Sequence, residues 1–192
     1  AEQHEADRQE ADRQEADRQE ADRREADRLA ALHRYGVLDT GDEAAFDRIT
    51  NLVKRLLDVP IALVTLVDEE RQWLKSCVGL EQRETPREIA FCDHNIRSED
   101  VMVVEDATAD PRFADNPLVT GPPRIRFYAG APLVTEGGYA LGSLCVIDTE
   151  PRSLSAGDRA TLETLAAVVV DEMTMRTHYA REHEILEHIG DG

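Results

Sequence analysis

The chain has 192 residues, of which 40 are acidic and 22 are lysine or arginine, so its formal net charge is −18. That negative field repels nucleic acid and anionic membrane surfaces, and we expect neither as a partner. The length favours one domain with appendages, and no run of residues approaches the ~20 apolar positions that a membrane span requires. The spacing of Cys77, Cys92 and Cys145 matches no zinc or disulfide framework, which favours free thiols in a cytoplasmic protein.

A short repeat dominates the first 28 residues. Five copies of Glu-Ala-Asp-Arg, each followed by a variable residue, run from Glu5 to Leu29. A period of five advances about 140° per copy on an α-helix, so the alanines wind around the helix and form no apolar stripe. We interpret residues 1–28 as a solvated charged helix or a tether. An arm that binds a partner or oligomerises is the alternative.

Helical patterns open the body of the chain, which we place at residues 29–175. Apolar residues at helical spacing start at Leu29, and Gly36 can end this helix. Thr40 and Asp42 offer amino-terminal caps to a second helix. The apolar face of the second helix consists of Phe46, Ile49, Leu52, Val53 and Leu56.

Five apolar runs of strand length follow, at residues 61–67, 72–78, 101–104, 124–132 and 141–148. The last two flank Gly137-Gly138, which predicts a hairpin. Short connections and flanking helices indicate class α+β. We expect a central antiparallel sheet of five or six strands, with the terminal helices on one face and short helices and loops on the other.

A final helix is predicted to start near Ser155, which can cap it. Beyond Met175 the sequence becomes polar, so residues 176–192 are interpreted as a linker helix that leaves the domain. The apolar face of this helix consists of Leu162, Leu165, Ala166, Val169 and Met173.

Several motifs, in order, resemble the GAF domain of multidomain signalling proteins of bacteria or archaea, such as sensor kinases. The resemblance covers roughly Tyr35 to Met173, and the last residues, 184–192, resemble the opening of a PAS domain. The matching segments are Tyr35–Thr40, Pro60–Val64, Arg71–Trp73, Glu84–Arg87, Phe91–His94, Val104–Asp106, Phe127–Pro132 and Gly142–Asp148.

The resemblance implies a GAF/PAS-like fold that binds a small molecule on the sheet face opposite its terminal helices. It also implies a homodimer formed through the first and last helices, and a downstream PAS or output domain in a longer protein. The ligand and any cofactor stay unidentified. Pigment-binding members place a cysteine next to a histidine, whereas Asp93 separates Cys92 from His94 here, and the cyclic-nucleotide signature of the family is absent.

The candidate ligand-pocket residues are Phe91, Cys92, His94, Arg112, Phe113, Arg126 and Tyr128. Cys92 and His94 would share a face on a strand, but residues 88–97 favour a short helix, on which they lie about 200° apart and cannot hold one metal ion. Phe127 and Tyr128 lie on opposite faces of their strand. Arg124 and Arg126 share a face and could hold an anionic ligand or pair with surface carboxylates.

The residues and the resemblance leave three functions open. The first is a sensory module that binds a ligand and regulates an output domain, and the second is an unliganded spacer that dimerises. The third is a thiol enzyme similar to the GAF-fold reductases of free methionine sulfoxide, for which Cys92 beside His94 is the only hint. No Ser-His-Asp motif, phosphate loop or zinc pattern is present, so we expect a module that is not an enzyme.

Overall fold

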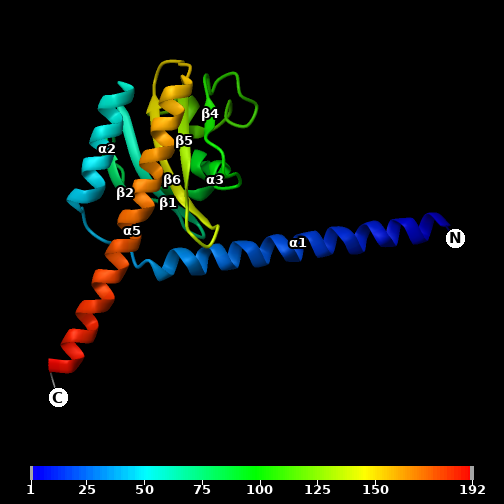
Figure 1. Cartoon of the computed structure of the whole chain (residues 1–192). Helices are drawn as coiled ribbons and strands as arrows, with labels where there is room; N and C mark the ends of the chain where they lie inside the picture. The colour runs from blue at the N-terminus through cyan, green and yellow to red at the C-terminus, as the bar shows by residue number, and fades with distance from the viewer. Residues whose placement is uncertain (1, 191–192) are drawn as a thin grey trace.

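The computed structural model describes the backbone of residues 2–190 and the side chains of residues 8–183. A sheet carries helices on both faces, and two long helices extend away from it (Figure 1). In chain order the elements are α1 (Glu2–Arg34), α2 (Ala44–Leu57), β1 (Ile61–Val67), β2 (Arg71–Val78), β3 (Glu84–Pro86), the short 3-10 helix η1 (Arg87–Ile89), α3 (Phe91–Asn95), β4 (Met102–Val104), α4 (Pro117–Thr120), β5 (Phe127–Val134), β6 (Ala140–Asp148) and α5 (Ala156–Gly190).

The six strands form one sheet in the order β3-β2-β1-β6-β5-β4, and every neighbouring pair is antiparallel. The predicted class α+β and the β5–β6 hairpin are therefore confirmed. The short edge strand β3 was not predicted. β5 starts at Phe127 rather than at Arg124, because Arg124 has a φ of 62°, a left-handed conformation that does not continue a strand.

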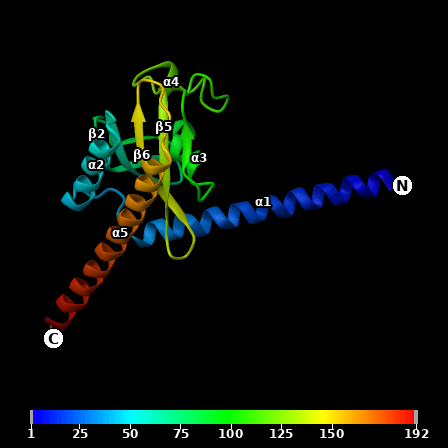
Figure 2. The same ribbon diagram turned by 45° about the horizontal axis from the view of Figure 1, so that its top comes forward.

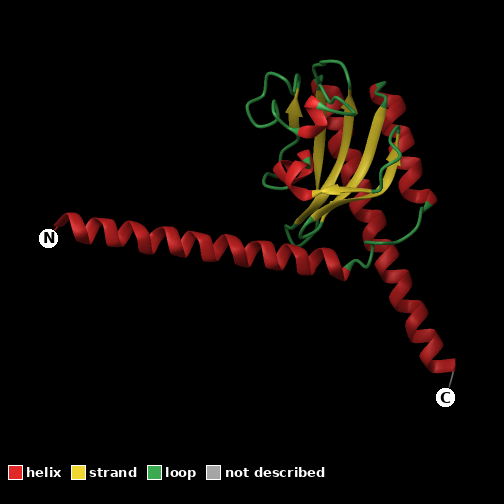
Figure 3. Cartoon of the chain, turned by 180° about the vertical axis from the view of Figure 1, so that it is seen from behind, coloured by secondary structure: helices red, strands yellow, loops and turns green. Residues whose placement is uncertain are grey.

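Each face of the sheet has its own apolar core. Figure 3 shows from behind the helices and loops that surround the sheet. One core lies under α2 and α5 and contains Phe46, Phe127 and Leu162. The other lies under α3 and the loops around α4 and contains Phe91 and Tyr128. Phe127 and Tyr128 thus lie on opposite faces, as the alternation along the strand predicted.

The predicted start and face of α2 are wrong in two respects. Glu43 occupies the cap position without a side-chain cap hydrogen bond, because Thr40 donates to the Val37 carbonyl and Asp42 pairs with Arg83. Leu52 and Leu56 are 42% and 56% exposed. α2 is rotated so that its buried side chains are Phe46, Ile49, Thr50, Val53 and Leu57.

α5 begins as predicted, since the Ser155 hydroxyl accepts a hydrogen bond from the Asp158 amide at 3.0 Å. Of the predicted apolar face, Leu165 is only partly buried, whereas Leu162, Ala166, Val169 and Met173 belong to the core. The helix continues to Gly190. The side chains of the PAS-like residues 184–190 lie outside those that the structure describes, as do residues 191 and 192.

α1 is one continuous helix, and its described pentad side chains from Arg8 to Arg24 are almost all exposed. Only its last turns contact the body, where Ala31 and Leu32 are buried and Arg28 donates to the Val67 carbonyl at 2.8 Å. Figure 2 shows the helix passing the end of the sheet and extending away from it. In the part of the chain that the structure describes, no helix is long and apolar enough to cross a bilayer.

Candidate functional site

Four of the candidate pocket side chains form a stacked column on the face of the sheet that α3 covers. The rings of Phe91 and Phe113 stack with centroids 4.0 Å apart and planes 6° apart. The Tyr128 ring lies 5.2 Å from that of Phe91 and is tilted by 35° against it, and the Arg112 guanidinium lies 5.1 Å from the centre of the Phe113 ring. His94 meets Phe113 edge-on at 4.9 Å. The predicted residues of α3, the loop and β5 therefore do come together.

The protein's own rings fill this face. Phe91, Phe113 and Tyr128 are all buried, and they belong to one apolar cluster that also includes Val119 and Ile125. Aromatic pairs in this geometry add about 0.5–1.5 kcal/mol beyond the area that they bury. A ligand at this face therefore has to displace a ring. Phe91 and Tyr128 lie on α3 and β5, whereas Phe113 lies in the loop between β4 and α4.

A buried polar cluster lies beneath the column, around Cys92. Its sulfur accepts a hydrogen bond from Thr65 Oγ1 at 3.1 Å, lies 3.1 Å from the Tyr128 hydroxyl and is 3.9 Å from the sulfur of Cys145. Burial raises the pKa of the Cys92 thiol, but hydrogen bonding by Cys145, Thr65 and Tyr128 outweighs burial and lowers this pKa to about 7. The hydrogen bond with Cys92, together with burial, raises the pKa of Cys145.

Asn95 closes the same cluster at the end of α3. Its Nδ2 donates to Ser143 Oγ at 2.7 Å, whereas its buried Oδ1 has no hydrogen-bond partner. An unpaired buried carbonyl oxygen costs about 1–3 kcal/mol, and a bound water or a small polar ligand would relieve that cost.

Cys92 and His94 diverge, as the predicted short helix requires. Cys92 faces the sheet, and His94 contacts the ring of Phe113. Burial, together with the positive charges of Arg97 and Arg112, lowers the pKa of His94, so this imidazole is neutral near pH 7. The two side chains do not converge on one point.

The arginines behave differently from the prediction. Arg126 donates through Nη1 to the carbonyls of Val119 and Ile125 at 3.1 and 3.0 Å, so it holds the backbone of the loop rather than a carboxylate. Arg112 pairs with Asp110 at 2.7 Å. Arg124 and Arg126 both precede β5, so they share no strand face.

An ion-pair chain that the sequence did not reveal joins α3 to α1. Arg87 donates through Nε to Asp93 Oδ1 at 2.7 Å and through Nη1 to Glu25 Oε1 at 2.6 Å. Arg28 pairs with the same Glu25. The only signal was the presence of Arg87 and Asp93 in two segments that resemble the family, and nothing local indicated that Glu25 of the pentad repeat meets them.

Comparison with known proteins identifies the family to which this fold belongs. The family model of the GAF domain matches residues 43–172. A cyclic di-GMP phosphodiesterase of Pseudomonas aeruginosa is 47% identical over 156 residues, which are 80% of this chain and 27% of that protein. The chain therefore spans about a quarter of the length of this relative.

Two solved structures show how widely the fold is used. The PixJ GAF domain of Thermosynechococcus elongatus, in its blue-light-absorbing form, matches with a TM-score of 0.60 at 15% identity, over 76% of this chain and 92% of that one. The free methionine-R-sulfoxide reductase of Neisseria meningitidis, bound to its substrate, matches with a TM-score of 0.57 at 19% identity, over 79% and 89%. Such identities establish the fold alone. With the family model matching most of the chain, the protein belongs to the GAF domain family and is a regulatory module of the sensory kind.

Proposed function

We propose that this GAF module holds a small molecule at the aromatic column and passes the resulting change to a catalytic output domain of a longer protein. The module itself is regulatory rather than catalytic in this proposal. The observation that carries it is the ion-pair chain through Arg87, which links the candidate ligand face to a helix that extends away from the body. A ligand can shift the equilibrium between two arrangements of this ion-pair chain only if it binds one arrangement more tightly than the other.

The ion-pair chain Glu25–Arg87–Asp93 is suited to carry a conformational change from α3 to α1, because its charges are partly buried. Burial raises the pKa of Glu25, but hydrogen bonds from Arg28 and Arg87 outweigh burial and lower this pKa to about 2. The pKa of Asp93 is also below its usual value, since Arg87 and Arg97 outweigh its burial. A shift of α3 would move Asp93 and so break or re-form the contact of Arg87 with α1.

The pH dependence of stability tests this link. A carboxylate whose pKa is lower in the folded state contributes stability above its unfolded pKa, 4.5 for Glu25, and loses it as the pH falls toward about 2. We expect Glu25→Gln to lower the free energy of unfolding at pH 7 and to differ progressively less from the wild type as the pH falls from 5 to 3. Urea unfolding at each pH measures this difference.

Glu20→Gln is the matched control, because Glu20 pairs only with the exposed Arg24 of its own helix. Exposed pairs of this kind contribute at most a few tenths of a kcal/mol. Equal effects of Glu20→Gln and Glu25→Gln at pH 7 would contradict the proposed link between α1 and α3.

The chemistry of the column suggests which molecules fit. A flat ring that replaced Phe113 would lie between the Phe91 ring and the Arg112 guanidinium. Stacking favours an aromatic molecule, and the face of the Arg112 guanidinium can cover such a ring while its edge keeps the ion pair with Asp110. A flat aromatic compound is therefore the proposed ligand class, and the unpaired Asn95 Oδ1 offers an additional acceptor beneath it.

The outer face of α5 supports a homodimer. Val168, Met175 and Tyr179 are exposed apolar side chains, the last two by 50% and 66%, and their spacings of seven and four place them on one stripe. Leu52 and Leu56 add exposed apolar surface on α2, which packs beside α5 in the same layer. We propose that two copies associate along this stripe and that α5 leads to a PAS or other output domain. By analogy with the Pseudomonas relative, an enzyme of cyclic di-GMP turnover is the proposed output.

Native mass spectrometry of the freshly purified chain tests ligand and dimer together. We expect a dimer that carries an additional non-covalent mass, which is lost on denaturation. The variant carrying both Met175→Glu and Tyr179→Glu should be a monomer, because like charges facing each other across a helix pair are destabilising. His178→Glu, at a neighbouring exposed position, should leave the dimer intact. A monomeric wild type would contradict the dimer, and a dimer without additional mass would favour the unliganded spacer.

A further inference from the structure

The two buried cysteines face each other across the junction of α3 and the sheet. Cys92 lies on α3, a helix of five residues between loops, and Cys145 lies on β6, one of the two central strands. Their sulfurs are 3.9 Å apart. The third cysteine, Cys77, lies apart from them on β2, is half-buried and donates to the Leu80 carbonyl.

We propose that Cys92 and Cys145 form a redox-active pair, in which a hydroperoxide converts the two thiols into a disulfide that fixes α3 to β6. A disulfide requires sulfurs about 2.05 Å apart, so the two sulfurs must approach by about 2 Å. Rotation about the side-chain bonds, with a small shift of the short helix, supplies such a movement. Because Cys145 belongs to a central strand, the bond would anchor the small helix to the most rigid part of the molecule.

The surroundings of Cys92 favour it as the attacking sulfur. The Thr65 hydroxyl donates to it at 3.1 Å, and the Tyr128 hydroxyl lies at the same distance on another side. Hydrogen bonds of this kind stabilise a thiolate, which is the nucleophilic form of cysteine. The lowered pKa of Cys92 and the raised pKa of Cys145 agree with these roles.

The chemistry proceeds in two steps. The Cys92 thiolate attacks the terminal oxygen of the hydroperoxide, the O–O bond breaks, an alcohol leaves after taking up a proton, and Cys92 becomes a sulfenic acid. The Cys145 sulfur, losing its proton, then attacks the Cys92 sulfur, the S–O bond breaks and water leaves. Two thiols are oxidised by two electrons, and one hydroperoxide is reduced to an alcohol and water. A dithiol reductant reverses the bond by exchange.

Access of peroxide to the two thiols limits the reaction, because both sulfurs are buried. Peroxide must enter while α3 opens briefly, and this opening is infrequent because it exposes the buried side chains of Phe91, Cys92 and Asn95. Oxidation should therefore be slow in buffer and faster in urea below the unfolding midpoint, where local opening is more frequent. This behaviour separates a native reaction from one of the unfolded chain.

The test uses the full chain, reduced and freed of reductant, then treated with hydrogen peroxide with and without sub-denaturing urea. After quenching, the protein is denatured, alkylated and weighed, and its peptides are mapped. We expect one alkylated thiol, at Cys77, a mass lower by two hydrogens for the remaining pair, and a peptide that links Cys92 to Cys145. Cys77→Ser is the matched control and should form the same link.

Cys145→Ala should lose the link and accumulate a Cys92 sulfenic acid that dimedone traps. Three free thiols in the wild type under both conditions would overturn the proposal. So would a link through Cys77, a Cys92 sulfinic acid beside an alkylated Cys145, or a link that forms only in fully denatured chain. None of these results bears on whether a small molecule occupies the aromatic column, so the proposed ligand-binding function stands or falls separately.

Discussion

Replacing Gly142 by alanine should destabilise the protein by more than about 3 kcal/mol, since the added atom meets backbone that cannot move aside. Gly142 lies in β6 opposite Leu66 of β1, at the centre of the sheet. A Cβ built there would lie 1.8 Å from the Thr65 carbonyl oxygen and 2.8 Å from the Leu66 Cα. The structure therefore assigns this glycine to close backbone packing between β6 and β1.

Gly137→Ala is the matched control. Gly137 lies in the β5–β6 turn, where the nearest atom to an added Cβ is in the Tyr139 ring at 3.4 Å. A change within about 0.5 kcal/mol is expected there. Guanidinium unfolding compares the two variants, and the soluble yield serves if Gly142→Ala does not fold. Equal unfolding midpoints would contradict the backbone clash.

The second large effect is expected at Lys75, whose ammonium is buried between α2 and the sheet. Lys75 is 1% exposed, pairs with Glu43, and donates to Thr40 Oγ1 and the Gly41 carbonyl at 2.8 and 2.7 Å. Lys75→Ala removes these donors, leaves a cavity beside Phe46 and should cost about 3–5 kcal/mol. Lys75→Met, which keeps the apolar stem, should cost less.

Thermal and urea unfolding measure both variants, with Lys54→Ala as the control. Lys54 is the other lysine of the chain and lies on the last turn of α2, so its replacement should change stability by no more than about 0.5 kcal/mol. A Lys75→Ala variant as stable as Lys54→Ala would show that the buried contacts of the ammonium contribute nothing net.

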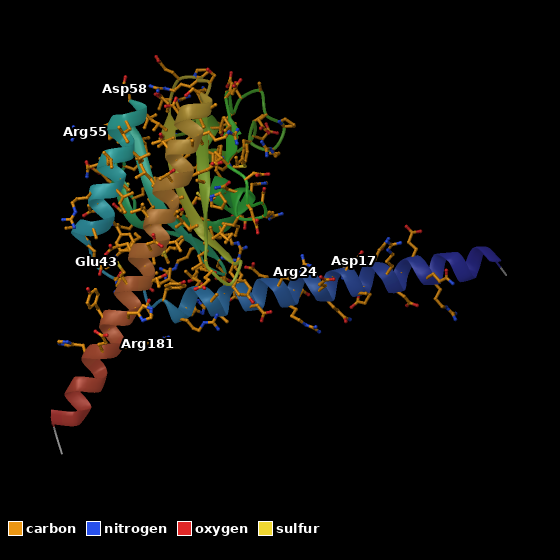
Figure 4. All side chains as sticks on the ribbon, viewed as in Figure 1. Asp17, Arg24, Glu43, Arg55, Asp58 and Arg181 are labelled. Carbon is orange, nitrogen blue, oxygen red and sulfur yellow. The ribbon has the colours of Figure 1, made fainter. Side chains whose placement is uncertain are left out.

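Glu43 connects the buried Lys75 to α5, because its carboxylate also pairs with Arg176. Its carboxylate accepts hydrogen bonds from Arg176 at 2.8 and 3.0 Å, and Figure 4 shows it at the start of α2, beside α5. Burial raises the pKa of Glu43, but Lys75 and Arg176 outweigh burial and hold this pKa below its usual value. One carboxylate thus joins the sheet, the start of α2 and the part of α5 that leaves the body.

Patterns within single elements were sufficient to predict five of the six strands and the family. The alternation around Phe127 and Tyr128, the glycine turn before β6 and the Ser155 cap are each decided by residues close in sequence. Leu52 and Leu56 show the limit, since the helical period identified an apolar stripe wider than the sheet covers. The hydrophobic period fixes which residues can face inward, and packing against the sheet decides which of them do.

Polar partners across the chain could not be predicted at all. Thr40 and Asp42 looked like caps because both are good caps, but Thr40 binds the Lys75 ammonium and Asp42 pairs with Arg83. Arg126 was a candidate for binding an anion, but its Nη1 donates to the backbone carbonyls of Val119 and Ile125. Such choices depend on residues that folding brings together from far apart in sequence, and a single sequence carries no record of them.

Because α1 is one continuous helix, the number of pentads determines how far it extends from the body. The helix runs without interruption from the repeat into the turns that dock Ala31 and Leu32, and Asp17 and Arg24 mark the stretch that extends beyond the body (Figure 4). One additional pentad would lengthen this rod by about 7.5 Å and rotate whatever is joined to its far end by about 140°. Because the repeat has no preferred face, the rod would stay equally well solvated after each insertion. The number of pentads therefore sets both the length of α1 and the rotation of its far end, in fixed steps, without altering the surface of the domain.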